Sequence, residues 1–478
     1  MGQERGAESE NRIALSFVNE GVTPVTSEML DRVDNIGINL LEISAPAQLN
    51  NLSIDSFFLL LTIDEIYSTP SQLTNEWRAI AQRAIHSFQE VDHVYPEKIA
   101  AINLFQYPDE QSELFFRTAS IIADTLLTIA ERPLYYQTHR QSAPAVKSPF
   151  RFVSVTYTNE LPEIALADNV INFKPSENLT ESLKRLERLF NATIETDEPI
   201  IIIPAEWFFD LLDRYPDMDI IFSSYINGKH QSFPLPNQTH FLPSPNWPII
   251  LLLMIWMFFA VLYRYRPLFM DNCSRYFLSH RFFVIDVIEN RNRNLADGLY
   301  MVLLHIFVSA LFFQTASFMF FGKNGLDVLS HYFPYLIISN YESISLFMIG
   351  IIFAATFHTI SIFWIYLFNK SMRMIAQAVN LYVWPFIINL IVMTLLVLSY
   401  QMGGGQNWPI ILTLIYFSVW FFSFNIAAIN GARFMDSFKI SYILLTVGIY
   451  FVFISALIIM ILLTPSIFEP VRLAYWLP

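Results

Sequence analysis

The sequence predicts two parts of different fold class: an α/β N-terminal domain, TIM-barrel-like, and an all-α polytopic membrane domain with about six transmembrane helices. Three observations predict this division. Short apolar runs alternate with amphipathic helical stretches through residues 12–236. Six longer apolar segments follow residue 246. The charge also changes, because residues 1–245 carry 34 acidic and 17 basic side chains whereas residues 246–478 carry 8 and 12.

Eight strand-like runs in the N-terminal half are short, apolar and rich in β-branched or aromatic residues. They are residues 12–17, 38–44, 57–63, 99–105, 133–138, 151–157, 169–173 and 199–204. Helical stretches with apolar residues three and four apart follow several of them, and the first of these stretches ends at Gly37, which suits a C-terminal cap. Eight strands alternating with helices predict an extracytoplasmic (β/α)8 barrel over residues 12–236, with an open parallel sheet as the alternative.

The remaining features of this half limit its partners. Residues 1–11 are expected to be disordered, and residues 237–246 to form a linker. The acidic balance argues against nucleic acid, because phosphate binding needs clustered Lys and Arg. The chain contains one cysteine, Cys273, so it has no intrachain disulfide. It also lacks the phosphate-loop, nucleophile-elbow and zinc-protease motifs, so we expect no cofactor and no metal.

Six segments after residue 246 are long and apolar enough to cross about 30 Å of hydrocarbon as helices. They are residues 247–263, 298–321, 345–367, 380–400, 409–430 and 440–463. The first is a connector, and the other five form a bundle over 298–463, followed by an external tail over 464–478. The Arg-rich segment 264–297 is expected to be cytoplasmic, either as an amphipathic element on the inner leaflet or as a solvated loop.

Basic residues are distributed unevenly among the connections between these spans. One side carries ten of them: Arg264, Arg266, Arg275, Arg281, Arg291, Arg293, Lys370, Arg373, Arg433 and Lys439. The other side carries Lys323 and Arg472. Lys and Arg resist translocation, so the side with ten is cytoplasmic, and the N-terminal domain and C-terminus are extracytoplasmic. We expect a multi-pass protein of the inner cell membrane, with the lipid bilayer as its partner.

The opening residues, MGQERGAESENR, have no apolar core and are not an export signal, although a translocated N-terminal domain requires one. We therefore expect a processed or misassigned N-terminus, with an in-frame signal segment upstream of Met1. The opposite orientation is the alternative.

Polar and aromatic residues near the ends of predicted strands are candidates for a ligand site, because barrel chemistry lies where strands meet the loops that follow them. The ligand-binding candidates are Glu20, Asp64, Glu65, Gln106, Gln137, His139, Tyr157 and Trp207. The carboxyls that a hydrolase would use are Glu42, Glu160 and Glu206. Rings that stack on sugar faces and carboxylates that bind hydroxyls suit a carbohydrate. The alternative is that each is an ordinary polar loop residue.

Two stretches resemble the barrels of glycoside hydrolases, over roughly residues 20–140. GVTPVTSEMLDRVDNIGINLLEIS is similar to the opening of such a barrel, and PEKIAAINLFQYPDE to its fourth strand. The resemblance implies a general-acid Glu, preceded by Asn, at the end of that strand. Gln106 and Tyr107 stand there instead, and neither is a proton donor tuned near neutrality. We therefore favour a non-catalytic ligand-binding domain or a structural cap over a membrane-tethered glycoside hydrolase.

The last five spans resemble the bacterial branch of the Yip-type five-span membrane family, over about residues 298–463. Pro385 in the fourth span, within VWPFIINLIVMTLLVLSY, Trp420 in the fifth span and the short polar turn before the sixth carry the resemblance. Eukaryotic members are associated with trafficking and small GTPases, and the bacterial branch implies no defined activity. For this chain the resemblance implies a bacterial cell-envelope protein.

Polar side chains within spans are functional candidates by default. His305 and His358 lie at comparable depth, measured from the cytoplasmic ends of the second and third spans, so we expect that they can meet and relay protons or bind a metal. The alternative interpretation is that each bonds a neighbouring backbone group or hydroxyl. Gln314, Asn389 and Asn425 are expected to hold helices together. The histidines are the residues on which a third functional class, a transporter or channel component, depends.

Overall fold

The computed structural model describes most of the chain, as two compact units, Met1–Phe241 and Leu242–Pro478. The described residues are 12–18, 25–49, 52, 54–63, 66–109, 112–138, 148–157, 170–176, 179–194, 199–229, 233, 247–291, 294–336, 342–369, 371–401, 407–435 and 438–477. The predicted disordered N-terminus, 1–11, and the predicted linker, 237–246, lie outside them.

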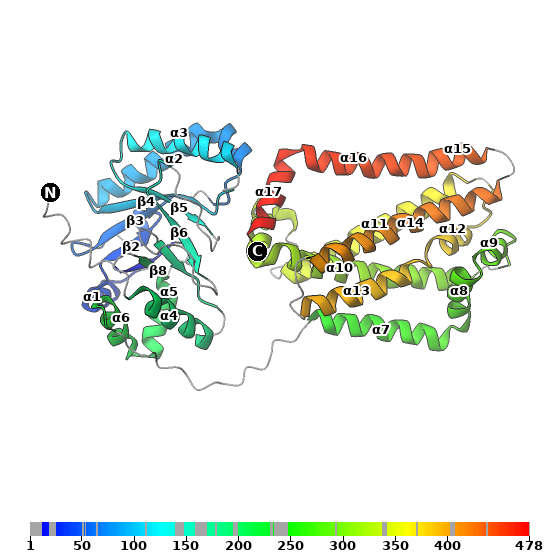
Figure 1. The fold of residues 1–478 in the computed structure, drawn as a ribbon, viewed down its shortest axis with the longest axis horizontal. Helices are drawn as coiled ribbons and strands as arrows, with labels where there is room; N and C mark the ends of the chain where they lie inside the picture. The colour runs from blue at the N-terminus through cyan, green and yellow to red at the C-terminus, as the bar shows by residue number, and fades with distance from the viewer. Residues whose placement is uncertain are drawn as a thin grey trace. The chain divides into compact units, whose positions relative to one another are not determined.

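The first unit is a closed barrel of eight parallel strands that pair in sequence order, with β8 closing onto β1 (Figure 1). The strands are β1 Ile13–Ser16, β2 Leu40–Ile43, β3 Phe58–Thr62, β4 Ile99–Gln106, β5 Leu134–Thr138, β6 Phe152–Tyr157, β7 Val170–Phe173 and β8 Ile200–Pro204. Every predicted strand is present within two residues at each end, which confirms the barrel and excludes the open sheet.

Helices cover the outside of this barrel (Figure 1). They are α1 Ser27–Ile36, the 3-10 turn η1 Pro46–Leu49, α2 Pro70–Val94, α3 Glu113–Leu127, α4 Leu179–Thr193, α5 Ala205–Arg214 and α6 Met218–Ile226. The first begins where the Thr26 hydroxyl accepts a hydrogen bond from the Met29 amide, and it ends at Gly37, whose φ of 95° is the left-handed cap that the sequence predicts. Helices α5 and α6 were not predicted.

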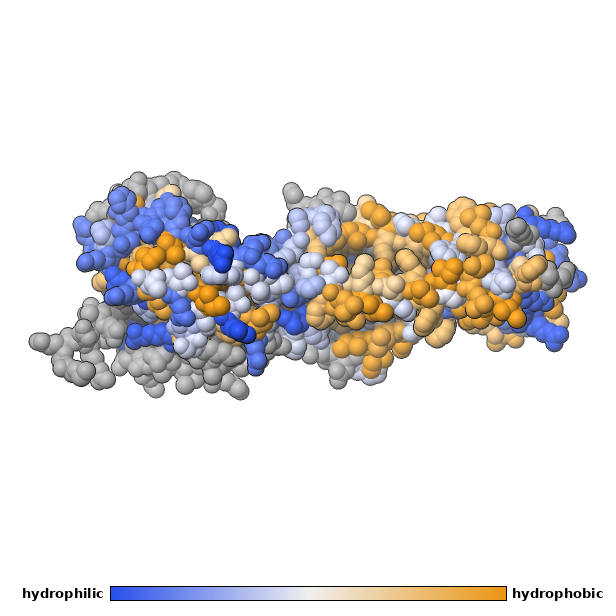
Figure 2. Space-filling model, turned by 90° about the horizontal axis from the view of Figure 1, so that it is seen from above, coloured by the Kyte–Doolittle hydropathy of each residue, from blue (hydrophilic) through white to orange (hydrophobic). Residues whose placement is uncertain are grey.

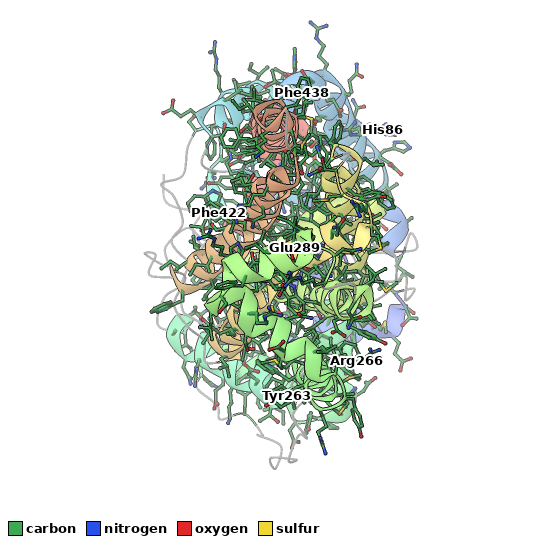
Figure 3. The ribbon with its side chains drawn as sticks, turned by 90° about the vertical axis from the view of Figure 1, so that its right-hand side faces the viewer. His86, Tyr263, Arg266, Glu289, Phe422 and Phe438 are labelled. Carbon is green, nitrogen blue, oxygen red and sulfur yellow. The ribbon has the colours of Figure 1, made fainter. Side chains whose placement is uncertain are left out.

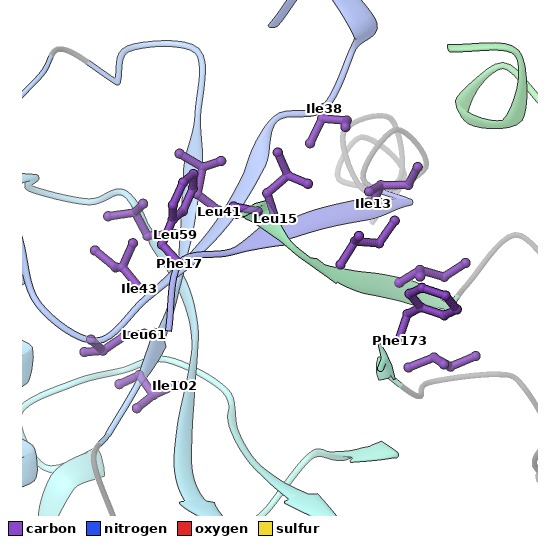
Figure 4. Packing of buried hydrophobic residues seen from close by; sticks show 14 of the residues in the cluster. Ile13, Leu15, Phe17, Ile38, Leu41, Ile43, Leu59, Leu61, Ile102 and Phe173 are labelled. Carbon is purple, nitrogen blue, oxygen red and sulfur yellow. The ribbon is translucent and has the colours of Figure 1, made fainter. Parts of the chain in front are cut away.

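Two apolar layers hold the barrel together. Outward-facing strand residues such as Leu15, Leu41 and Leu61 pack under the helices in one large buried cluster (Figure 4). Inside the barrel lies a second, smaller cluster, made of Ala14, Leu40, Leu60, Ala101, Tyr135, Val170 and Ile202. The two sets alternate along each strand, because successive side chains point to opposite faces of a sheet.

The second unit is a bundle of apolar helices, and its surface is largely hydrophobic (Figure 2). Five helical segments in the described part of the chain are long and apolar enough to cross a membrane: α7 Trp247–Tyr265, α10 Leu295–Tyr332, α11 Glu342–Leu367, α14 Asn407–Gly431 and the segment Lys439–Leu463. This last segment is continuous and comprises α15 Lys439–Ile443, η4 Leu444–Gly448 and α16 Ile449–Leu463. A sixth candidate is the bent pair α12 Ile375–Tyr382 and α13 Phe386–Gln401. These match the six predicted spans and are those of a multi-pass membrane protein.

The bent span breaks by 41° between α12 and α13, at Trp384 and Pro385. Proline lacks an amide hydrogen and its ring clashes with the preceding turn, so the helix cannot continue through it. The Ser423 hydroxyl of α14 donates a hydrogen bond to the carbonyl oxygen of Tyr382, one of the groups released by the break. A neighbouring helix thus satisfies backbone that the membrane cannot.

Short helices close both ends of the bundle. The Arg-rich segment forms α8 Pro267–Leu278 and α9 His280–Ile288, which lie at the same end as α12 and α15 (Figures 1 and 3). Arg275 of α8 pairs with Asp286 of α9. The predicted tail contains α17 Pro465–Trp476, at the opposite end of the bundle. It packs on α10 so closely that a Cβ on Gly325 would overlap the carbonyl oxygen of Ala474.

Candidate functional site

The inner face of the barrel changes from apolar to polar toward the carboxyl ends of the strands. The residue two positions beyond an inner apolar residue faces the lumen again, and in seven strands that next residue is polar. The lumen-facing polar residues are Ser16, Glu42, Thr62, Asn103, Gln137, Ser154, Thr156 and Asn172. This end of a parallel barrel is where ligands and chemistry are found.

Glu42 is the one carboxyl that the eight described strands present to the lumen. It is 3% exposed, and its Oε1 accepts a hydrogen bond from the Thr62 hydroxyl at 2.6 Å. Burial raises the pKa of Glu42, because the charged form loses its hydration, and hydrogen bonds from Ser16 and Thr62 partly oppose this rise. The group therefore retains its proton to a higher pH than an exposed glutamate.

Asn103 of β4 is the most conspicuous polar group of the lumen. It is completely buried, and neither its Oδ1 nor its Nδ2 has a hydrogen-bond partner. The hydroxyl of Ser154 on β6 is buried without a partner in the same way. A buried amide without partners costs about 1–3 kcal/mol in proteins, so such groups are normally satisfied by water or a ligand. The lumen thus offers unused donors and acceptors.

The end of β4 carries the residues that the sequence analysis placed there. The register between β4 and β5 shifts between Asn103 and Phe105, and this bulge brings Gln106 beside Gln137 on the lumen side. Gln106 donates a long hydrogen bond, 3.4 Å, to the carbonyl of Ile63. Gln137 donates to the hydroxyl of Tyr107 at 2.7 Å, and burial raises the pKa of Tyr107 to about 12. Amides and a neutral phenol therefore surround this position.

Three other candidates lie away from the lumen. Tyr157, the last residue of β6, faces outward and stacks on Phe173, with ring centroids 6.4 Å apart. Trp207 of α5 contacts the same Phe173 ring at 5.3 Å, so both belong to the packing layer between strands and helices. Glu206 is an exposed residue in the first turn of α5, because β8 continues directly into that helix.

Five candidates, Glu20, Asp64, Glu65, His139 and Glu160, lie outside the described residues. Conversely, Asn103, Thr62 and Ser154 were not singled out from the sequence. The available signal was the asparagine in the middle of the apolar run IAAINLF, because an amide in a buried strand needs a partner.

A second polar centre lies inside the membrane bundle, where the two histidines meet. His305 Nδ1 and His358 Nε2 are 2.8 Å apart, and both rings are buried. Asn389 Nδ2 donates to His305 Nε2 at 2.9 Å, and the hydroxyl of Tyr416 lies 3.2 Å from the same nitrogen. His358 Nδ1 bonds the hydroxyl of Tyr382 at 3.0 Å. Five helices, α10 to α14, thus contribute to one hydrogen-bonded chain.

Aromatic rings enclose this hydrogen-bonded chain of side chains. Phe386 stacks on His305 with ring centroids 4.0 Å apart and planes inclined by 21°. Trp420 stacks on His358 at 5.1 Å and 22°, while its indole nitrogen donates to the Tyr382 hydroxyl at 3.2 Å. Throughout the part of the chain that the structure describes, no group of three or more His, Cys, Asp or Glu side chains is arranged to hold a metal ion.

Comparison with known proteins adds little to this geometry. No protein-family model matches the chain, and no curated protein matches it. Among solved structures, a β-glucuronidase from Ruminococcus gnavus in complex with D-glucaro 1,5-lactone matches with a TM-score of 0.31 and 11% identity, over 40% of this chain and 42% of that chain. The chain therefore spans less than half of that enzyme. The Yip-type resemblance of the bundle stays a prediction.

Proposed function

We propose that the protein is a membrane-anchored binding protein whose barrel holds a small polyhydroxylated ligand, a carbohydrate, at the carboxyl end of its strands. The observation that carries this proposal is Asn103, a buried amide on the lumen face with both polar atoms unpartnered. Sugar hydroxyls donate and accept hydrogen bonds, so one ligand hydroxyl can satisfy either atom. Convergent amides and hydroxyls in an enclosed site are the usual basis of such recognition.

The proposed activity is binding without hydrolysis. Glycoside hydrolysis uses two carboxyls that flank the scissile bond, one of them a proton donor. The strands present Glu42 to the lumen, whereas Gln106 occupies the position at which the glycosidase resemblance implies the general acid. An amide does not transfer a proton at neutral pH. The raised pKa of Glu42 favours the alternative, a tethered glycoside hydrolase, since a general acid must hold its proton.

The proposed location is the inner membrane of a cell envelope, with the barrel and the C-terminus outside the cytoplasm. Support comes from the distribution of basic residues, because the cationic segments around α8, α9 and α15 belong to one end of the bundle. In this arrangement the bundle anchors the barrel.

The proposal is tested with the full-length protein in lipid nanodiscs. Binding of glucose, galactose and glucuronic acid is measured by saturation-transfer NMR, and hydrolysis is measured with the corresponding p-nitrophenyl glycosides. We expect at least one sugar to bind the wild type and the Glu206→Gln variant, and Asn103→Leu to weaken that binding at least tenfold, because a ligand hydroxyl loses its amide partner. Nitrophenol should not be released.

Three outcomes contradict the proposal. Release of nitrophenol that Glu42→Gln abolishes would establish the hydrolase instead. Equal sugar binding by the wild type and Asn103→Leu would show that the sugar does not bind at Asn103 in the lumen. Absence of binding by all three sugars would contradict the carbohydrate ligand itself.

A further inference from the structure

The histidine chain belongs to the second unit, whereas the residues proposed to bind carbohydrate belong to the first, and its hydrogen-bond geometry points to a different ligand. We propose that His305 and His358 form a binding site for a single proton inside the membrane, shared between the two rings and released or taken up as one unit. Three features of the site support this assignment: the count of donors and acceptors around the pair, the aromatic faces that cover it and its position at the broken span.

The neutral pair leaves one acceptor unused. Asn389 Nδ2 donates to His305 Nε2, so in the neutral state the His305 proton is on Nδ1 and donates to His358 Nε2 across 2.8 Å. The His358 proton is then on Nδ1 and donates to the Tyr382 hydroxyl at 3.0 Å. Every ring nitrogen is thereby satisfied. Asn389 Oδ1, in contrast, is buried and has no partner.

One added proton satisfies that acceptor. When a proton is added to His305 Nε2, this nitrogen becomes a donor, and the Asn389 amide turns about its last side-chain bond to present Oδ1, beside the Tyr416 hydroxyl at 3.2 Å. The bonds from His305 to His358 and from His358 to Tyr382 persist unchanged. A second proton has no place, because it would put N–H groups on both nitrogens of the 2.8 Å contact. The pair therefore has a capacity of one.

The surrounding rings suit a delocalised cation. A positive charge is attracted to the face of an aromatic ring within about 6 Å of its centroid. Phe386 and Tyr416 stack on His305 with centroids 4.0 and 5.7 Å away, and Trp420 stacks on His358 at 5.1 Å. Three ring faces thus compensate part of the cost of charge in an enclosed site.

The groups that face the pair are few. The Tyr416 hydroxyl of α14 contacts His305 and shares a hydrogen bond of 2.8 Å with the hydroxyl of Ser309 of α10. The Tyr382 hydroxyl of α12 contacts His358. These two phenols are the titratable groups in contact with the rings. Among the described residues no carboxylate, lysine or arginine contacts either ring. Within the described part of the bundle, a proton on the pair thus adds a positive charge that no ionised side chain contacts.

The pair is also joined to both halves of the broken span. Tyr382 is the last residue of α12, and Phe386 is the first residue of α13. Because both contact the histidines, gain of a proton acts on the two sides of the 41° break at once.

The test uses full-length protein, labelled with ¹⁵N-histidine and reconstituted in lipid bilayers. Solid-state NMR distinguishes the two neutral tautomers from imidazolium, and the ¹⁵N–¹⁵N coupling across the N–H···N bond identifies this pair among the nine histidines of the chain without a substitution. Between pH 8 and pH 4 we expect one proton to be taken up per pair, with the coupling retained.

Substitution of the unused acceptor provides the second measurement. Asn389→Leu removes the nearer of the two groups that can accept from the protonated Nε2 and leaves the Tyr416 hydroxyl at 3.2 Å, so it should weaken proton uptake about tenfold. Asn425→Leu is the matched control, a buried asparagine of α14 whose Nδ2 bonds the Phe421 carbonyl, and it should titrate as the wild type does. Rings that both stay neutral at pH 4, uptake of two protons, or equal titration of the two variants would overturn the proposal. If Asn389→Leu does not fold, the wild-type titration alone decides.

Discussion

Replacement of Asn103 by leucine should make the ligand-free barrel more stable. The Asn103 amide is fully buried with both polar atoms unpartnered, while leucine has the same number and branching of side-chain heavy atoms and no polar atom. A buried amide without partners costs about 1–3 kcal/mol, so Asn103→Leu should raise the free energy of opening of the ligand-free barrel by about that amount. Each 1.4 kcal/mol is about a tenfold change in an equilibrium constant, which gives roughly 5- to 150-fold slower exchange.

Hydrogen exchange of the full-length protein, read on peptides that cover β4 and β5, measures this change directly. Asn172→Leu is the matched control, because Asn172 also faces the lumen but is only half-buried. Its exchange should change little. Unchanged or faster exchange in Asn103→Leu would refute the reasoning, since it would mean that the Asn103 amide already has partners.

Two further predictions concern a charge and a close contact. Because burial raises the pKa of Glu42, the folded protein binds this proton more tightly than the unfolded chain, and stability falls as pH rises from about 4.5 through the folded pKa. Glu42→Gln should remove that fall and be more stable than the wild type at pH 8, seen as slower hydrogen exchange of β2 after correction for intrinsic rates. The exposed Glu206→Gln should keep the wild-type pH dependence; a decline in Glu42→Gln parallel to that of the wild type contradicts this. Gly325→Ala should loosen α17 by about 1–3 kcal/mol, seen as faster exchange in residues 465–476, because its Cβ meets the Ala474 carbonyl. Gly448→Ala has open space and should leave α17 unchanged; equal exchange in the two variants would contradict the close contact.

The strands and spans could be predicted because they depend on local patterns. Period-two and β-branched runs identified all eight strands, and length and hydrophobicity identified the six spans. Helix α5 was not predicted because β8 ends at Pro204 and the helix begins at Ala205, with no polar turn between them. The sequence there has no boundary that a local pattern reveals.

The lumen could be predicted only in part, because which face of a strand lies inside depends on register. Counting by two from Asn103 puts Gln106 on the outer face, and the bulge before Phe105 returns it to the lumen. In β6 the side chains alternate between the two faces without a bulge, so Thr156 lies inside and Tyr157 outside, although both end the same strand. A one-residue shift is not visible in the sequence.

For the histidines, comparable span depth predicted that the rings can approach, and in the structure two of their nitrogens lie 2.8 Å apart. Two of their other partners, Asn389 and Tyr382, come from the two sides of the broken span. No count along single helices brings these residues together, because helix rotation and the break decide which side chains face the pair.

The side of the membrane on which the barrel lies is the central claim, since an external carbohydrate reaches the lumen only from there. Two single-cysteine variants test it in a Cys273→Ser background: Gln89→Cys, at an exposed position of α2, and Arg291→Cys, at an exposed position after α9. A membrane-impermeant maleimide applied to intact spheroplasts should label Gln89→Cys at once and Arg291→Cys only after lysis. Labelling of Arg291→Cys in intact spheroplasts, with Gln89→Cys protected until lysis, would contradict the account.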